Sequence, residues 1–196
     1  MTKHLILVKH SVPEIEAGHP ANTWKLSKEG RLRAQRLAEQ LKSFGPEVIA
    51  SSAEPKAEET AEIVASQLQL DVQIVPDLHE HARSNVPYLS HDAFQASIHD
   101  FFQKPDELVF GEETANQAYT RFYRAVHSVL SEHRNKTVAI VTHGTVISLF
   151  VSRLTGTSDL ELWNQLGLPS FVAIDLHSNT LIVRTVILYG EHHGIR

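Results

Sequence analysis

The sequence contains no cysteine in its 196 residues, which excludes disulfide bridges, thiolate metal ligands and a cysteine nucleophile. It also lacks an excess of positive charge, because 18 Lys and Arg stand against 23 Asp and Glu, a formal net charge of −5. That balance argues against binding to nucleic acid or to an anionic membrane surface. No apolar run approaches the ~18 residues of a membrane-spanning helix, and the amino terminus lacks the pattern of a secretion signal. These absences predict a soluble, cytoplasmic protein.

Hydrophobic residues make up 42% of the sequence, enough at this length for a substantial core. No repeat, low-complexity tract or linker divides the chain, so we expect one domain over residues 1–196. Short apolar runs predict four strands, over residues 3–9, 48–52, 72–75 and 137–141. Two later runs, joined by Ser178-Asn179, predict a closing hairpin over residues 170–176 and 180–188.

Segments with apolar residues at helical spacing lie between the predicted strands. The first helix is expected to be capped by Ser27 and to end at Gly45, with Leu32, Leu37 and Leu41 on its apolar side. The same spacing predicts helices over residues 55–68, 115–129 and 145–154. Strands alternating with helices predict an α/β fold, a three-layer α/β/α sandwich with a mostly parallel central sheet.

Each predicted parallel strand is followed by residues that carry charge or can transfer a proton. Lys9 and His10 follow the first strand, and Lys56 lies just beyond the second. Glu80 lies beyond the third strand, and His143 comes directly after the fourth. Because ligands of such sheets bind beyond the carboxyl ends of the strands, we expect these side chains to converge on one rim.

The position of Lys56 points to an anion. In the first turn of a helix that begins at Pro55, the helix dipole disfavours a cation by ~0.3–1 kcal/mol, so an anion is expected to share the place. His143 stands at another helix start, where exposed N–H groups bind phosphate-like groups. The alternative for Lys56 is a solvated lysine whose stem points away from the site.

Together these groups suit phosphoryl transfer. A neutral imidazole is a nucleophile toward phosphorus, while lysines, a second histidine and helix-start amides stabilise the charge on the phosphoryl oxygens. A carboxyl group can protonate the leaving oxygen and then take a proton from the attacking water. These roles are filled, with no metal and no cofactor, by His10, Lys9, Lys56, His143 and Glu80.

The same residues fall in motifs that resemble those of the histidine phosphatase superfamily, which includes the cofactor-dependent phosphoglycerate mutases. The family's strand followed by Arg-His-Gly is represented by LVKHS, and its closing Thr-His-Gly is intact in VTHGTVI. The matches occur in order from residue 5 to about residue 150, and the others are LSKEGRLRAQRLAEQL (26–41), SSAEPKAEETA (51–61), LHE (78–80) and GEET (111–114).

The resemblance implies a phosphohistidine mechanism and a role for each residue. His10 would be the nucleophile, His143 would bind the phosphoryl oxygens, and Glu80 would be the proton donor and acceptor. Lys9 and Lys56 would occupy the two positions where the family has phosphate-binding arginines. The ligands it implies are a small phosphorylated substrate and inorganic phosphate.

Three further residues are candidates for binding phosphate or substrate. Ser11 stands in place of the motif's glycine, and Gly144 completes the Thr-His-Gly motif. Arg83 is a candidate to reach into the pocket and replace lost arginine function, and the alternative is that it lies in a solvated loop. Lysine for arginine is not a conservative exchange, because arginine offers a planar bidentate fork and lysine a compact point charge.

We therefore predict a metal-independent phosphatase that acts on a small phosphomonoester, and three alternatives stay open. The first is a mutase, which needs an enclosing lid; residues 78–110 look compact for one. The second is a phosphate-binding or regulatory member of the family with weakened catalysis. The third is a metal site at His79 and His81, for which the sequence offers no third ligand at helical spacing. Neither the substrate nor the oligomeric state follows from the sequence.

Overall fold

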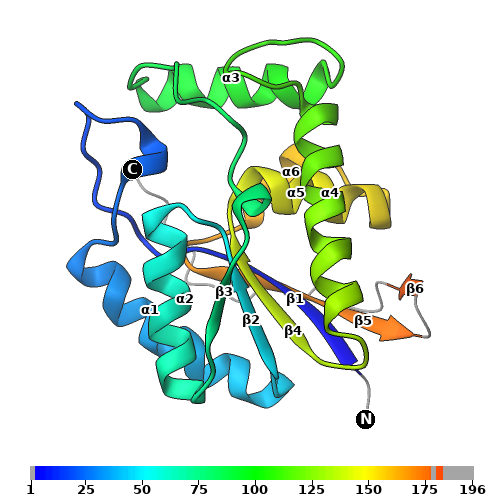
Figure 1. Ribbon diagram of the computed structural model, residues 1–196. Helices are drawn as coiled ribbons and strands as arrows, with labels where there is room; N and C mark the ends of the chain where they lie inside the picture. Colours follow the sequence, from blue (N-terminus) through cyan, green and yellow to red (C-terminus); the bar gives the residue numbers. More distant parts are fainter. Residues whose placement is uncertain (1–2, 178–179, 183–196) are drawn as a thin grey trace.

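A six-stranded sheet in the order β3-β2-β4-β1-β5-β6 forms the centre of the protein (Figure 1). The computed structural model describes residues 3–177 and 180–182. Strands β1 to β4 run parallel, whereas β5 is antiparallel to β1 and β6 is antiparallel to β5. Their bounds are Lys3–Lys9 (β1), Val48–Ser51 (β2), Val72–Ile74 (β3), Val138–Thr142 (β4), Ser170–His177 (β5) and Thr180–Ile182 (β6).

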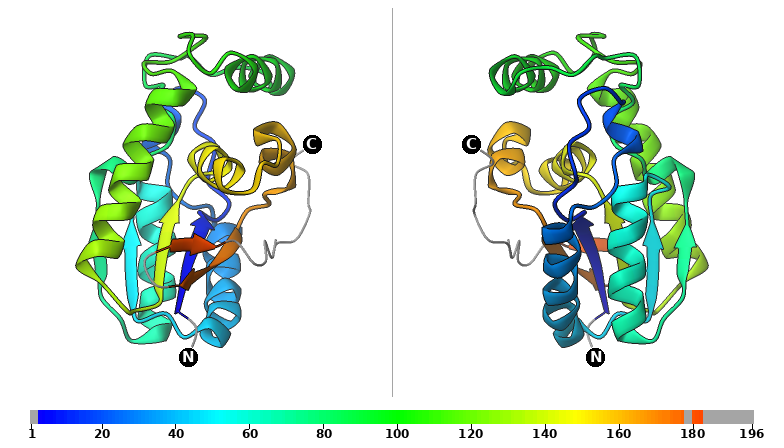
Figure 2. Two further views of the ribbon diagram at one scale, coloured as in Figure 1. Left: turned by 90° about the vertical axis from the view of Figure 1, so that its right-hand side faces the viewer. Right: turned by 90° about the vertical axis from the view of Figure 1, so that its left-hand side faces the viewer.

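Helices cover both faces of this sheet, as the two side views in Figure 2 show. One face carries α1 and α2, and the other carries α4, α5 and α6. The helix bounds are Lys28–Leu41 (α1), Pro55–Leu68 (α2), His91–Gln103 (α3), Ala115–Glu132 (α4), Gly144–Thr155 (α5) and Asp159–Gln165 (α6). The predicted α/β/α sandwich is confirmed. Within the described residues, no helix has the length and apolar character needed to span a membrane.

The central strand β1 shows why the sheet is covered by helices on both faces. Its side chains from Leu5 to Val8 are fully buried, and they alternate between two core clusters. Ile6 and Val8 pack toward α1 and α2, whereas Leu5 and Leu7 pack toward α4 and α5. A strand that is apolar on both faces must be sandwiched between layers, as the continuous apolar run predicts.

Helix α1 begins as expected but faces the core slightly differently. The Ser27 hydroxyl accepts a hydrogen bond from the Gly30 amide, so Ser27 is the N-cap. Leu37 and Leu41 are buried, but Leu32 is 46% exposed, so its predicted place on the apolar side is wrong. Leu32 lies five residues before Leu37, about 140° around the helix at 3.6 residues per turn.

The structure adds two helices that the sequence analysis did not predict, α3 and α6. Helix α3, capped by the Ser90 hydroxyl, occupies part of the segment over residues 78–110. It stands beyond the carboxyl ends of the parallel strands, apart from the sheet (Figures 1 and 2). Its buried residues Ile98, Phe101 and Phe102 pack in a third cluster with α4 and α5 rather than on a strand.

The predicted closing hairpin is present as far as the structure describes it. Strands β5 and β6 pair antiparallel, with Asp175 opposite Ile182. The connecting Ser178-Asn179 and the predicted continuation over 183–188 lie outside the described residues.

Candidate active site

The ends of two neighbouring parallel strands bring His10 and His143 together. Lys9 pairs with Thr142 at the last register position of β1 and β4, so each histidine is the next residue along its strand. The His10 N–H donates to the Thr142 carbonyl at 2.9 Å, which continues the ladder by one residue. The two imidazole ring centres lie 5.2 Å apart. The register between β1 and β4 therefore brings His10 and His143 together at the rim of the sheet, as expected.

The hydrogen bond at Nδ1 prepares His10 to act as a nucleophile. Its Nδ1 lies 2.7 Å from the Ser11 carbonyl, which can only accept, so Nδ1 carries the proton and Nε2 keeps its lone pair. Burial lowers the pKa of His10 well below 6.5, and the charges of His143 and Lys56 lower it further. The imidazole is therefore neutral at pH 7, the form that can attack phosphorus.

His143 is fully buried beside the second strand end. Its Nε2 lies 2.8 Å from the Ser52 hydroxyl and 3.5 Å from a carboxylate oxygen of Glu54. Its Nδ1 is buried and has no hydrogen-bond partner among the described residues. Burial, followed by the charge of Lys56, lowers the pKa of His143 well below 6.5. The side chain therefore contributes a neutral hydrogen-bonding group to the site.

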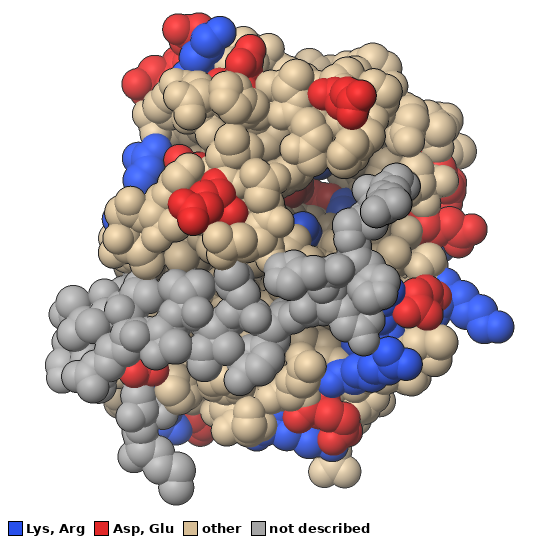
Figure 3. All heavy atoms as spheres, turned by 180° about the vertical axis from the view of Figure 1, so that it is seen from behind, with Lys and Arg blue, Asp and Glu red and all other residues tan. Residues whose placement is uncertain are grey.

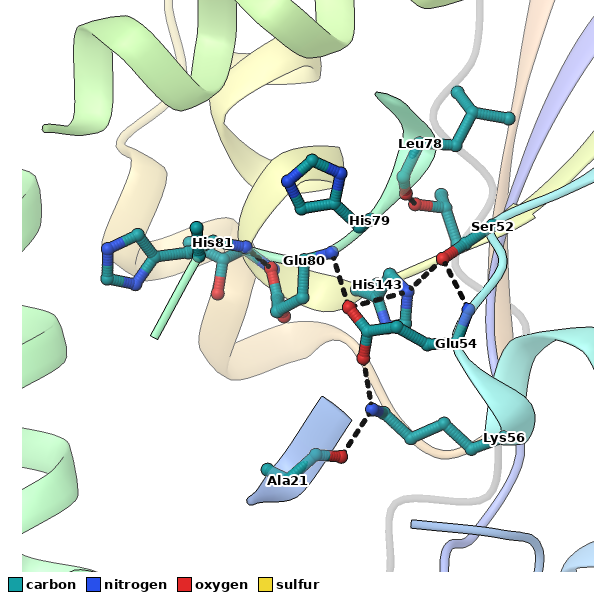
Figure 4. Close-up of polar contacts among 12 residues, drawn as sticks. Ala21, Ser52, Glu54, Lys56, Leu78, His79, Glu80, His81 and His143 are labelled. Carbon is teal, nitrogen blue, oxygen red and sulfur yellow. Dashed lines mark hydrogen bonds and ion pairs between the residues drawn. The ribbon is translucent and has the colours of Figure 1, made fainter. Parts of the chain in front are cut away.

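Lys56 is not a solvated lysine, because only 5% of its surface is exposed. Its Nζ forms an ion pair with the Glu54 carboxylate and donates to the Ala21 carbonyl at 2.7 Å (Figure 4). The anion expected at this helix start is thus supplied by the protein itself. Sequence reasoning missed Glu54, although its place two residues before the lysine, at the strand-to-helix turn, was a signal.

Glu80 is held by two backbone amides from different segments. Its carboxylate accepts from the His81 amide at 2.9 Å and from the Thr145 amide, near the start of α5, at 3.3 Å. Burial is the largest influence and raises the pKa of Glu80, but Arg83, His143 and the His81 amide together hold the pKa below 4.5. Glu80 is therefore ionised at neutral pH in the free protein, ready to accept a proton.

Lys9 lies over the first residue of helix α5. A Cβ added at Gly144 would stand 3.1 Å from the Lys9 Cε, so the glycine leaves the room that the lysine stem occupies. The Lys9 Nζ donates to the Leu166 carbonyl at 2.9 Å. Burial lowers the pKa of Lys9 to about 8, against the opposing influence of the nearby Glu80 charge. Gly144 thus has a packing role beside the site.

Ser11 does not face the candidate site. It is fully buried, and its hydroxyl donates to the Gly30 carbonyl at 2.7 Å, while its amide donates to Thr60 Oγ1 at 3.0 Å. These bonds fasten the loop after β1 to helices α1 and α2. The expectation that Ser11 binds phosphate is corrected, because its only side-chain donor is already used.

A cavity of about 200 Å³ opens in front of Lys56 and Glu80. Arg83 lines it, with its guanidinium 5.0 Å above the Phe94 ring and with a buried Nη1 that has no hydrogen-bond partner among the described residues. Seen from behind, the surface has a hollow in which basic and acidic atoms lie together (Figure 3). The remaining lining residues are Ala21, Asn22, Glu54, His79, His81, Ala82, Ser84 and Glu112.

Arg121, on α4, fixes the loop that carries Glu80, and sequence reasoning did not single it out. Its guanidinium donates to the carbonyls of Asp77, His79 and Glu80 at 2.7, 3.0 and 3.1 Å. It also pairs with Glu113 at 2.6 Å, and both side chains are mostly buried. No sequence motif marked this residue, because the carbonyls that it binds belong to residues more than 40 positions away.

The two histidines that flank Glu80 point into different surroundings (Figure 4). His81 is buried between Phe101 and Phe110, with its Nε2 3.1 Å from the Glu113 carbonyl. The Nδ1 of His79 lies 2.8 Å from the Pro76 carbonyl. Among residues 3–177 and 180–182, no group of three or more His, Cys, Asp or Glu is placed to hold a metal ion.

Known proteins share both the sequence pattern and the fold. Residues 5–186 match the histidine phosphatase superfamily, branch 1. Over 193 residues the chain is 24% identical to the adenosylcobalamin/alpha-ribazole phosphatase of Escherichia coli K12, covering 93% of this chain and 94% of that protein. Among solved structures, the mycobacterial glucosyl-3-phosphoglycerate phosphatase has a TM-score of 0.73 at 18% identity, covering 96% and 97% of the two chains. YhfR of Bacillus stearothermophilus has a TM-score of 0.75 at 24% identity, covering 93% and 96%.

Proposed function

Because the chain belongs to the histidine phosphatase superfamily, we propose that it hydrolyses a small phosphomonoester through a phosphohistidine intermediate on His10, without a metal. The observation that carries the proposal is the state of His10. Its imidazole is neutral, its Nδ1 is bound to the Ser11 carbonyl, and its Nε2 has no hydrogen-bond partner among residues 3–177 and 180–182, at the rim that also carries Lys9, Lys56 and His143. The names of similar proteins, which are phosphatases, agree with this reaction class.

The first half-reaction transfers the phosphoryl group to the protein. The His10 Nε2 lone pair forms a bond to phosphorus while the bond from phosphorus to the ester oxygen breaks. Lys9, Lys56 and His143 stabilise the charge that gathers on the phosphoryl oxygens. The leaving oxygen takes a proton from the Glu80 carboxyl. Because Glu80 is ionised in the free protein, this proton arrives with the substrate, whose monoanion predominates below about pH 6.

The second half-reaction returns the protein to its starting state. Water attacks phosphorus, the Glu80 carboxylate accepts its proton, and the bond from phosphorus to His10 Nε2 breaks to release inorganic phosphate. Glu80 then passes the proton to the departing phosphate and is ionised again. Hydrolysis is favoured over a mutase reaction because the cavity in front of Lys56 and Glu80 opens to solvent. Asn22, Ser84 and Glu112 line the cavity and are exposed.

The proposal is tested by following phosphate release from p-nitrophenyl phosphate between pH 4 and 8 in the presence of EDTA. A panel of phosphomonoesters and one phosphodiester then defines the reaction class. We expect release from monoesters alone, and no loss of rate with EDTA. Phosphate binding without release from any monoester would favour the alternative, a phosphate-binding module.

The charge of Lys9 predicts an alkaline limit to activity. Its pKa of about 8 means that the ammonium loses its proton above that pH, and the site then holds phosphate less tightly. We expect the protonated fraction of Lys9 to fall about fivefold between pH 8 and 9, and kcat/KM to fall by that factor beyond the loss that the ionisation of the substrate itself causes. Lys9→Arg should remove this additional fall and leave only the part due to the substrate, because a guanidinium stays charged. An alkaline limb that is unchanged in Lys9→Arg would contradict the assignment to Lys9.

A further inference from the structure

One carboxylate already occupies the hydrogen-bond donors that a phosphate group would need. A Glu54 oxygen accepts from the Glu80 amide at 2.8 Å and lies 3.5 Å from the His143 Nε2. The other oxygen forms the ion pair with Lys56 (Figure 4). Lys56, the Glu80 amide and the His143 ring come from three different segments and meet around the Glu54 carboxylate. A lysine ammonium and a backbone amide that point at one place suit an oxyanion, and a carboxylate presents two of the oxygens that a phosphate presents.

The side chain of Glu54 does not cap helix α2, although Glu54 is the N-cap residue. Glu54 is the N-cap residue of α2, where an acidic side chain ordinarily accepts from the helix amides. It makes no such capping bond, and its carboxylate points instead into the cavity that it lines. Only 8% of its surface is exposed, so the contact is built into the site rather than formed on the surface.

We propose that Glu54 is an internal competitor for the phosphate site of the proposed phosphatase, on whose function this inference rests. Phosphate binds when the Glu54 carboxylate leaves Lys56, His143 and the Glu80 amide, since two anions cannot share one cation and remain stable side by side. The return of the carboxylate displaces the product. Glu54 therefore weakens the binding of substrate and inorganic phosphate and speeds phosphate release.

The backbone allows this exchange without unfolding of the helix. Glu54 has extended dihedral angles (φ −72°, ψ 132°) and precedes the first helical residue, Pro55. Rotation of its side chain therefore breaks no helical hydrogen bond. The adjoining cavity of about 200 Å³ gives the displaced carboxylate a place beside the bound group.

The test compares inorganic phosphate binding by calorimetry in the wild type, Glu54→Gln and Glu59→Gln. Glutamine keeps the size of the side chain and an oxygen for the Glu80 amide but removes the charge. We expect Glu54→Gln to bind phosphate about tenfold more tightly than the wild type. Glu59→Gln, the matched control, removes the same charge from the same helix at a residue paired with Arg31, and should change the dissociation constant less than about twofold.

Equal affinity in the wild type and Glu54→Gln would overturn the proposal, and so would an equal gain in Glu59→Gln, which would indicate a general effect of charge. If Glu54→Gln does not fold, Glu54→Ala takes its place. In Glu54→Ala, acetate should compete with phosphate, because it fills the position that the carboxylate leaves. In the wild type, acetate should not compete. Absence of competition in Glu54→Ala overturns the proposal. Hydrolysis of p-nitrophenyl phosphate is measured on the same samples. Tighter binding with no hydrolysis in any variant would uphold the role of Glu54 and reject the phosphatase function.

Discussion

His10→Ala is expected to lower kcat for phosphomonoester hydrolysis by at least about 10³-fold, because it removes the group that forms the bond to phosphorus. The substitution also deletes a buried imidazole whose Nδ1 holds the Ser11 carbonyl, so folding must be checked by thermal melting. Loss of turnover in a protein that still melts cooperatively identifies a chemical role. The measurement is steady-state phosphate release at pH 6, with His99→Ala as the control, since His99 lies on the exposed surface of α3.

The phosphohistidine itself can be trapped. Brief incubation with labelled substrate followed by denaturation in alkali should leave label on the wild type and none on His10→Ala, because a phosphoramidate survives alkali and is cleaved by acid. Turnover that persists in His10→Ala would reject the mechanism. Label on a different residue in that variant would reject the assignment of the nucleophile.

Arg121→Met is expected to have the second largest effect, on both stability and catalysis. It leaves the Glu113 carboxylate mostly buried without its partner, which typically lowers the free energy of unfolding by ~3 kcal/mol. It also frees three backbone carbonyls of the loop that presents Glu80, so kcat should fall at least about tenfold through loss of the proton donor's position. Chemical denaturation and steady-state kinetics measure the two effects.

A second substitution separates stability from positioning. Arg121→Met combined with Glu113→Gln removes both charges and keeps a side-chain oxygen for the Ala82 amide, which Glu113 binds at 2.9 Å. We expect the double variant to regain most of the lost stability, since removing both charges of a buried pair is often neutral. Its kcat should stay low, because the loop carbonyls still lack their donor. Recovery of kcat together with stability would show that Arg121 has a structural role only.

The strands and their ends were predictable because local sequence dictates them. A run such as Leu5 to Val8, apolar at every position, needs cover on both faces, and the polar residues after it mark the rim of the sheet. Ser27 and Pro55 likewise announce helix starts through their own chemistry. In these cases a few neighbouring residues contain all the information required.

The features of the fold and of the site that were not predicted depend on contacts between distant segments. Helix α3 was not predicted, although its apolar residues Phe94, Ile98, Phe101 and Phe102 recur at helical spacing. What the sequence did not show is that these residues pack against α4 and α5 rather than on a strand. The contact of Glu54 with the Glu80 amide joins residues 26 positions apart. The Ser11 side chain points away from the candidate site because its hydroxyl binds the Gly30 carbonyl. The close approach of this loop to α1 requires glycine at position 30, where a Cβ would stand 2.1 Å from the Val12 carbonyl oxygen. Contacts of this kind depend on how distant segments pack together, and short stretches of one sequence do not show that packing.

The separate attachment of α3 has a consequence for how this protein can be altered. Its apolar face packs in a cluster to which none of the described strands contributes a residue. It meets the cavity through the stacking of Arg83 on Phe94. We expect that the segment over residues 84–110 can be altered while the strand ends that hold His10 and His143 keep their register, provided that Phe101 and Phe110, which cover His81 beside Glu80, are kept. For protein engineering, the strand ends that carry His10 and His143 should be left unchanged. Substitutions meant to alter substrate preference should be made in the segment over residues 84–110.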